Sequence, residues 1–162
     1  MEKDPALEQE FISTVQQNKQ IIYKVCYMYA SNSDELNDLY QEVVINLWRG
    51  FCNFRGDSSI SSWIYRIGLN TCISYYRKSS SRPKTVALVD NLEVYEDTSK
   101  TAQLKELYRL INMLNKLERA LILLWLDDKT YDEIAEIMGL NRNTIASKLK
   151  RIKTKIVEMA NQ

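Results

Sequence analysis

Histidine is absent from this 162-residue sequence, and glycine, proline and cysteine are scarce. Without histidine the chain lacks the commonest general base and metal ligand, which argues against many classes of enzyme. Four glycines and two prolines are too few for a β fold rich in turns. The three cysteines, Cys26, Cys52 and Cys72, do not have the spacing of a metal site, so we expect reduced thiols that act as small buried hydrophobes.

Long apolar runs are also missing. No run reaches the roughly 18 residues that a membrane-spanning helix needs, and the N-terminus lacks a secretory pattern. These features and the cysteines predict a cytoplasmic protein without direct membrane insertion. The sequence is nevertheless 45% hydrophobic and 27% charged, so we expect packed cores and not general disorder.

Charge is unevenly distributed along the chain, although the formal net charge is only +1. The net charge is −4 over residues 1–50, +5 over 51–85, −5 over 86–140 and +5 over 141–162. Two basic blocks separated by acidic ones indicate two contacts with anionic partners and two surfaces for protein partners.

Apolar residues recur with the helical period through most of the chain. Asp4 and Pro5 predict the start of a first helix, with a break at residues 17–19. A further helix is expected from about Ile60 to Lys78. Between these segments lies an amphipathic helix with one apolar stripe, formed by Leu36, Leu39, Val43, Leu47 and Phe51.

The helical pattern disappears between residues 79 and 100 and resumes after it. The intervening segment has no sustained period, so we interpret it as a flexible linker. The predicted fold is therefore all-α, with two small helical bundles, residues 1–78 and 101–162, joined by this linker.

The second bundle contains the capping and turn residues of a helix-turn-helix. Thr130 and Glu133 form a capping box, Gly139 supplies a left-handed turn residue and Asn141 caps the last helix. Amide, hydroxyl and cationic groups then share the outward face, which suits the major groove of DNA. The candidate DNA-contacting residues are Arg142, Asn143, Thr144, Ser147, Lys148 and Arg151. The alternative is a solvated basic helix near the chain end.

The first basic block differs in kind, because basic and aromatic side chains alternate after a polar loop. Binding of single-stranded DNA requires arginines that contact its phosphates and a pocket that holds its exposed bases. The candidate residues are Arg55, Ser58, Ser59, Trp63, Arg66, Asn70 and Arg77. The alternatives are a core position for Trp63 and solvated charges for the arginines.

Three segments, in this order, resemble the extracytoplasmic-function sigma factors, the smallest members of the bacterial primary-sigma superfamily. NDLYQEVVINLWRGF, residues 37–51, is similar to the polymerase-binding helix of that family. FRGDSSISSWIYRIGLN, residues 54–70, resembles its melting and minus-ten segment, and residues 114–156 resemble its minus-thirty-five reader. Each motif alone is moderately specific, whereas the ordered set is highly specific.

The resemblance implies that residues 1–78 are sigma domain 2, residues 79–100 the interdomain linker and residues 101–162 sigma domain 4. It implies a factor without catalytic activity or cofactor that binds core RNA polymerase, directs it to promoter DNA and assists melting. The polymerase contacts would be the largest-subunit clamp helices and the flap region, and an anti-sigma factor, often membrane-tethered, is a further implied partner. The implied polymerase-binding residues are Asp38, Leu39, Gln41, Glu42, Leu47 and Trp48.

The loop from Asn53 to Ser59 would capture a base flipped from the melted minus-ten element. Leu69 stands where the family often has a cation, so one phosphate contact is not carried over. Three other functional classes stay open from the residues alone. One is a helix-turn-helix regulator that dimerises through its first bundle, and another is a metal-dependent enzyme using Asp38 and Glu42. The third is a pure adaptor such as an anti-terminator, which would leave the last helix unexplained.

Overall fold

The structure is a computed structural model, and it describes residues 4–78 and 101–162. Within these two ranges the chain forms eight α-helices, in agreement with the predicted all-α class. They belong to two compact units, one built from helices α1 to α4 and the other from α6 to α9. In the described ranges none of the helices has the length and apolar character to span a membrane. The predicted linker lies outside the described residues.

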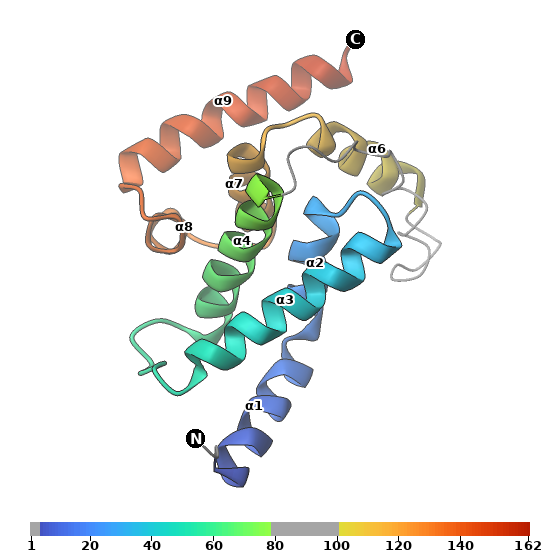
Figure 1. The fold of residues 1–162 in the computed structure, drawn as a ribbon. Helices are drawn as coiled ribbons and strands as arrows, with labels where there is room; N and C mark the ends of the chain where they lie inside the picture. Colours follow the sequence, from blue (N-terminus) through green and yellow to red (C-terminus); the bar gives the residue numbers. More distant parts are fainter. Residues whose placement is uncertain (1–3, 79–100) are drawn as a thin grey trace. The chain divides into compact units, whose positions relative to one another are not determined.

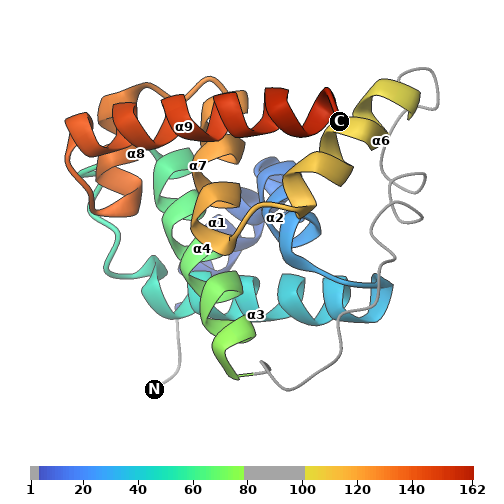
Figure 2. The ribbon, with the colours of Figure 1, turned by 90° about the horizontal axis from the view of Figure 1, so that it is seen from above.

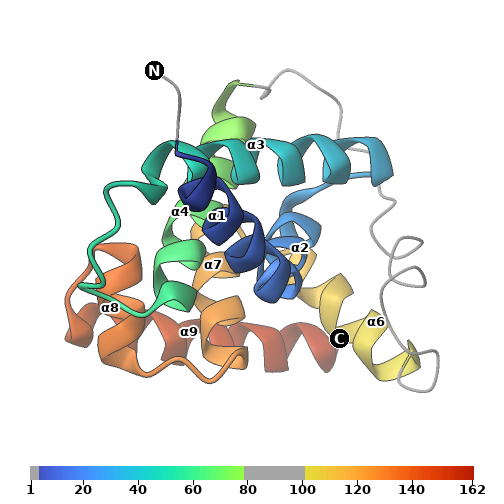
Figure 3. The same cartoon turned by 90° about the horizontal axis from the view of Figure 1, so that it is seen from below.

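Four helices form the first unit (Figures 1 and 3). The Asp4 side chain caps α1 by accepting a hydrogen bond from the Ala6 backbone N–H at 3.0 Å, and Pro5 follows it at the first helical position. The expected break falls at Asn18, between α1 and α2. The helices are α1 (Pro5–Gln17), α2 (Lys19–Tyr29), α3 (Ser33–Phe51) and α4 (Ile60–Lys78).

The core of this unit forms where α2, α3 and α4 meet. The two helices α2 and α4 pack closely, and a Cβ at Gly68 would lie 3.4 Å from Cγ1 of Val25. The predicted apolar stripe of α3 is confirmed, because all five of its side chains are buried. Burial of this stripe holds α3 in one rotational orientation and leaves its opposite face at the surface.

Two of the three cysteines contribute to the same core. Cys26 on α2 and Cys72 on α4 are fully buried. A hydrogen bond with Cys26, together with burial, raises the pKa of the Cys72 thiol well above its usual value. Cys52 is exposed, so the expectation that all three cysteines are buried was wrong. Its position just after the α3 stripe ends places it outside the core.

The second unit contains α6 (Thr101–Asn112), α7 (Lys116–Leu126), α8 (Tyr131–Met138) and α9 (Arg142–Ala160). Figure 2 shows α9 running along the other three helices, and it packs against each of them. Ile145, Leu149 and Ile152 are its buried residues, as the helical spacing predicts. The outward face of α9 is therefore the one expected from the sequence.

The helix ends of this unit are fixed by hydrogen bonds. The predicted capping box at Thr130 and Glu133 is present, and a second one joins Asn115 and Glu118 at the start of α7. Gly139 has a φ of 68°, and Asn141 accepts a hydrogen bond from the Thr144 N–H at 2.8 Å. These contacts set the turn between α8 and α9.

Candidate polymerase and nucleic-acid interfaces

The surface face of α3 is polar with one apolar residue in it. Asp38, Gln41 and Glu42 are exposed, and they lie at helical spacing with Ile45. Ile45 is 42% exposed, although it is a large apolar side chain on an otherwise polar face. A strip of this kind suits a protein partner, because apolar contact supplies affinity and the surrounding charges supply orientation.

Two residues of the implied polymerase-binding set do not lie on this face. Leu39 and Leu47 are buried in the core, with at most 1% of either side chain exposed, so direct contact with a partner was a wrong expectation for both. They belong to the stripe that orients α3. Trp48 is half-buried, and its ring lies 4.9 Å from the ring of Phe11 on α1. Part of the Trp48 ring is thus occupied by packing within the unit.

The loop between α3 and α4 is held at its end by a serine cap. The Ser59 hydroxyl accepts a hydrogen bond from the Ser62 N–H at 3.1 Å, so Ser59 has a structural role at the start of α4. Ser58 is half-buried, and its hydroxyl donates to the Ser59 carbonyl at 3.3 Å. Arg55 is exposed, and Gly56 takes a φ of 78° beside it. The tip of this loop is therefore open to a ligand, whereas its end is anchored.

Helix α4 presents only part of the predicted single-strand surface. Asn70 is exposed, and Arg66 is half-buried with contacts inside the protein. The ring of Trp63 lies 4.9 Å from that of Phe54 and 6.2 Å from that of Phe51. Trp63 is half-buried and packs in this aromatic cluster, so only part of its ring is open to a base. The side chain of Arg77 lies outside the described residues.

The structure explains why a leucine can stand at position 69, where the family often has a cation. The Leu69 side chain is 2% exposed, so the position belongs to the core of this unit. A leucine there stabilises packing, and no phosphate contact can come from it.

A small hollow adjoins the loop between α3 and α4. Its volume is about 260 Å³, and its walls come from α1, the end of α3, the loop and the start of α4. The lining residues are Leu7, Glu10, Thr14, Phe51, Cys52, Phe54 and Ile60.

The polar face of α9 begins at its first residue. Arg142, Asn143, Ser147 and Arg151 are exposed, and Thr144 and Lys148 are half-buried. All six predicted residues therefore lie on the side of α9 that the buried isoleucines and leucine leave free. This face has amide, hydroxyl and cationic donors without a carboxylate in the first turn.

An ion pair joins the two helices of the turn. A guanidinium nitrogen of Arg142, Nη1, lies 3.6 Å from Oδ2 of Asp132 at the start of α8. No motif in the sequence marks Asp132 as a functional residue. Asp132 lies in the first turn of α8, where an acidic residue is expected because it interacts favourably with the helix dipole. Its position in the sequence therefore gave no indication of a contact with Arg142.

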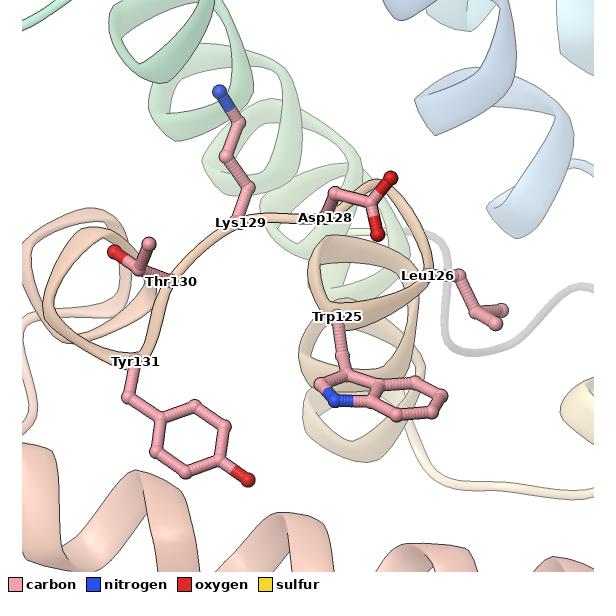
Figure 4. Close-up of a pocket in the computed structure, with 6 residues that line it drawn as sticks. All are labelled: Trp125, Leu126, Asp128, Lys129, Thr130 and Tyr131. Carbon is pink, nitrogen blue, oxygen red and sulfur yellow. The ribbon is translucent and has the colours of Figure 1, made fainter.

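A second hollow, of about 560 Å³, lies between the end of α7 and the start of α8. Trp125 and Tyr131 line it, and Figure 4 shows their rings extending from the two helix ends in the same direction. The Lys153 ammonium lies 4.6 Å from the centre of the Trp125 ring, within range of a cation–π interaction. Leu126, which is 42% exposed, adds apolar surface to the rim.

Comparison with known proteins matches both units to one family. The Sigma-70 region 2 profile matches residues 14–82, and the Sigma-70, region 4 profile matches residues 104–156. The chain is 32% identical over 143 residues to the ECF RNA polymerase sigma-E factor of Haemophilus influenzae, covering 79% of this chain and 75% of that protein. The chain belongs to the extracytoplasmic-function sigma factor family. Its function is therefore promoter-specific transcription initiation with RNA polymerase.

Other relatives agree with this assignment. The RNA polymerase sigma factor SigV of Bacillus subtilis is 28% identical over 162 residues, which cover 93% of this sigma factor and 91% of SigV. The sigma factor RpoE of Bartonella quintana, solved with the anti-sigma factor NepR, has the same fold, with a TM-score of 0.72. That structural match has 20% sequence identity and covers 98% of each chain.

The roles of Ile45 and Asp132 in this sigma factor, and the contact of Lys153 with Trp125, were not predicted from the sequence. Ile45 left a signal, since an isoleucine at the centre of an acidic and amide-bearing face breaks the amphipathic pattern. The contact between Lys153 and Trp125 left no signal in the sequence, because it joins residues of two helices whose packing the sequence does not specify.

Proposed function

We propose that this sigma factor divides promoter recognition between its two units. The first unit binds core RNA polymerase and holds the separated minus-ten strand, and the second recognises duplex DNA at the minus-thirty-five element. The observation that carries the proposal is the polar face of α9, where exposed donors of three chemical types lie side by side on a helix-turn-helix. The factor acts without catalysis or a cofactor of its own.

The exposed face of α3 is our candidate for the clamp helices of the largest polymerase subunit. Asp38 and Glu42 supply negative charge, Gln41 supplies an amide and Ile45 supplies apolar contact in the middle. A central apolar residue ringed by polar ones is the usual arrangement of an energetically important contact. Trp48 extends this face at its end, whereas Leu39 and Leu47 act only by orienting the helix.

The flap region of the polymerase is our candidate partner for the hollow in the second unit. Trp125 and Leu126 expose apolar surface there, and Tyr131 and Lys129 add polar groups to the lining. Surfaces that combine an exposed tryptophan with a polar rim are typical of protein contacts.

For melting, we assign capture of a flipped base to the tip of the loop between α3 and α4 and the hollow beside it. Phe51 and Phe54 offer apolar walls to a base, and Arg55 offers charge to the backbone. Asn70 lies exposed on α4 and can hydrogen-bond a base edge. Trp63 contributes by supporting Phe54.

We infer that an anti-sigma factor regulates this sigma factor, and that the sigma factor acts in the cytoplasm. Two structural relatives support the first inference. RpoE of Bartonella quintana is solved with NepR, and CnrH, with a TM-score of 0.69 and 17% identity, is solved with the cytosolic domain of CnrY. Cytoplasmic action follows from the proposed partners, polymerase and promoter DNA.

Run-off transcription from genomic templates tests the proposal. Core polymerase with this chain is expected to give discrete transcripts from a small set of sites that core polymerase alone does not use. An independent helix-turn-helix regulator would instead protect a palindromic duplex from nuclease without polymerase. Tight footprints by the isolated chain, with no new transcripts in the presence of core polymerase, would overturn the proposal.

A further inference from the structure

The ion pair between Arg142 and Asp132 joins the first residue of α9 to the first turn of α8. The distance from Nη1 of the guanidinium to Oδ2 of the carboxylate is 3.6 Å. The Arg142 side chain is 64% exposed and that of Asp132 is 74% exposed. Both groups therefore lie at the surface of the helix-turn-helix.

Stability of the fold does not explain this pair. Exposed ion pairs contribute little to folding, because water screens them and two long side chains must be ordered. A cation at the first position of a helix is also opposed by the positive end of the helix dipole. Helix α9 has no acidic residue in its first turn that would offset this charge. What the pair can change is the set of positions that the Arg142 guanidinium occupies before DNA binds.

The contact engages one nitrogen of the guanidinium. Arginine reads guanine through two parallel hydrogen bonds to O6 and N7, and a guanidinium has five N–H groups arranged as a rigid fork. The closest approach to Asp132 is through Nη1, so the ion pair does not occupy the Nε and Nη2 donors. A carboxylate on one edge and a guanine on the other can therefore be bound at the same time.

We propose that Asp132 is a specificity-determining residue that positions Arg142 to read one guanine–cytosine pair of the minus-thirty-five element. This inference rests on the proposed function and extends it to a residue outside the recognition helix. Holding the guanidinium in advance removes part of the entropy lost when a flexible side chain is immobilised on binding. Because an exposed ion pair is worth at most about 1 kcal/mol, the expected gain in discrimination at that base pair is about two- to fivefold.

The negative charge of Asp132 is expected to weaken non-specific binding to DNA, whereas its contact with Arg142 is expected to strengthen base discrimination. A carboxylate beside the recognition helix repels phosphates, so it lowers binding to any duplex regardless of sequence. Removing it should tighten non-specific binding and weaken base discrimination together. A folding defect would lower both quantities, so these opposite signs separate a positioning role from a structural one.

The experiment uses holoenzyme assembled from core polymerase and this chain. Templates with randomised bases upstream of a promoter found by run-off transcription are transcribed, and the base preference at each position is read from the transcripts. Wild type, Asp132→Ala, Arg142→Ala and the double variant are compared. Glu136→Ala is the matched control, because it removes one exposed acid from the same helix one turn further along.

Asp132→Ala is expected to reduce discrimination about two- to fivefold at the base pair where Arg142→Ala also reduces it. It should have no further effect at that pair in the Arg142→Ala background. Asp132→Ala should bind promoterless duplex more tightly than wild type does, and Glu136→Ala should keep the wild-type base preference. An unchanged preference in Asp132→Ala, or an equal loss in the Arg142→Ala background, would overturn the assignment.

The two proposals fail in different ways in this experiment. If wild-type holoenzyme selects no sequence upstream, the proposed minus-thirty-five recognition fails. If wild-type holoenzyme selects a sequence and Asp132→Ala selects the same one with the same strength, only the role of Asp132 fails.

Discussion

The centre of the Phe11 ring lies 4.9 Å from the centre of the Trp48 ring, and this contact packs α1 against the exposed end of α3. The same phenylalanine meets Phe51 edge-on at 5.2 Å. Aromatic contacts of this kind add to the free energy gained by burying the rings. Phe11 is therefore the anchor of the first helix, and Trp48 owes its position in part to it.

Phe11→Ala should destabilise the first unit by about 3 kcal/mol, because it leaves a cavity against two aromatic rings. The adjacent Ile12 is 41% exposed, so Ile12→Ala should change the free energy of unfolding by no more than about 0.5 kcal/mol. Urea unfolding followed by tryptophan fluorescence measures both. Equal effects of the two substitutions would contradict the anchoring role.

Gly139→Ala should destabilise the second unit by about 1 kcal/mol. The cause is the backbone, since φ is 68° and a Cβ would meet nothing within 4 Å. Gly139→Asn should cost less, because asparagine tolerates the left-handed region. Thermal unfolding of the three proteins orders them, and an alanine variant as stable as wild type would contradict the assigned turn geometry.

The capping box at Thr130 predicts a pH dependence of stability. Hydrogen bonds from the backbone N–H and side chain of Thr130, with help from Lys129, lower the pKa of Glu133 below its ordinary value of 4.5. The folded-state pKa is depressed, so this stabilisation is present above pH 4.5 and is lost as the pH falls through the folded value. The Tm difference between wild type and Glu133→Gln should therefore shrink as the pH is lowered below 4.5. A difference that stays constant with pH would exclude the linkage.

Asn70→Ala should leave holoenzyme bound to a promoter but impair opening several-fold, because the variant loses a hydrogen-bonding group for the captured base. Permanganate reactivity of thymines in the minus-ten region measures the opening. Ser74→Ala is the matched control, since Ser74 is exposed one turn further along α4. Unchanged permanganate reactivity in Asn70→Ala would remove this residue from the melting site.

The fold follows closely from the sequence, because its signals are local. Caps at Asp4, Thr130 and Asn141, with the left-handed Gly139, all lie where side-chain chemistry alone predicts them. The capping box at Asn115 was missed although the asparagine–glutamate spacing is present in the sequence. Local rules of this kind need no knowledge of tertiary packing.

The candidate site was less predictable, because a helical face has two sides and a resemblance does not say which side each residue takes. Leu39 and Leu47 fall within a motif that is similar to a polymerase-binding helix, yet they form the core. Trp63 lies in a segment whose basic and aromatic residues suggest base stacking, yet it also packs against Phe54 and is half-buried. Asp132 gains its role from a contact between two helices, which depends on the turn geometry between them.

Assembly with core RNA polymerase tests the central claim most directly. Wild-type chain mixed with core enzyme should elute as a stable holoenzyme in gel filtration. Ile45→Asp, which places a charge at the centre of the α3 face, should weaken that binding by at least about tenfold. Ile12→Asp, a similarly exposed isoleucine on α1, should not. No holoenzyme with the wild-type chain, or full binding by Ile45→Asp, would contradict the account.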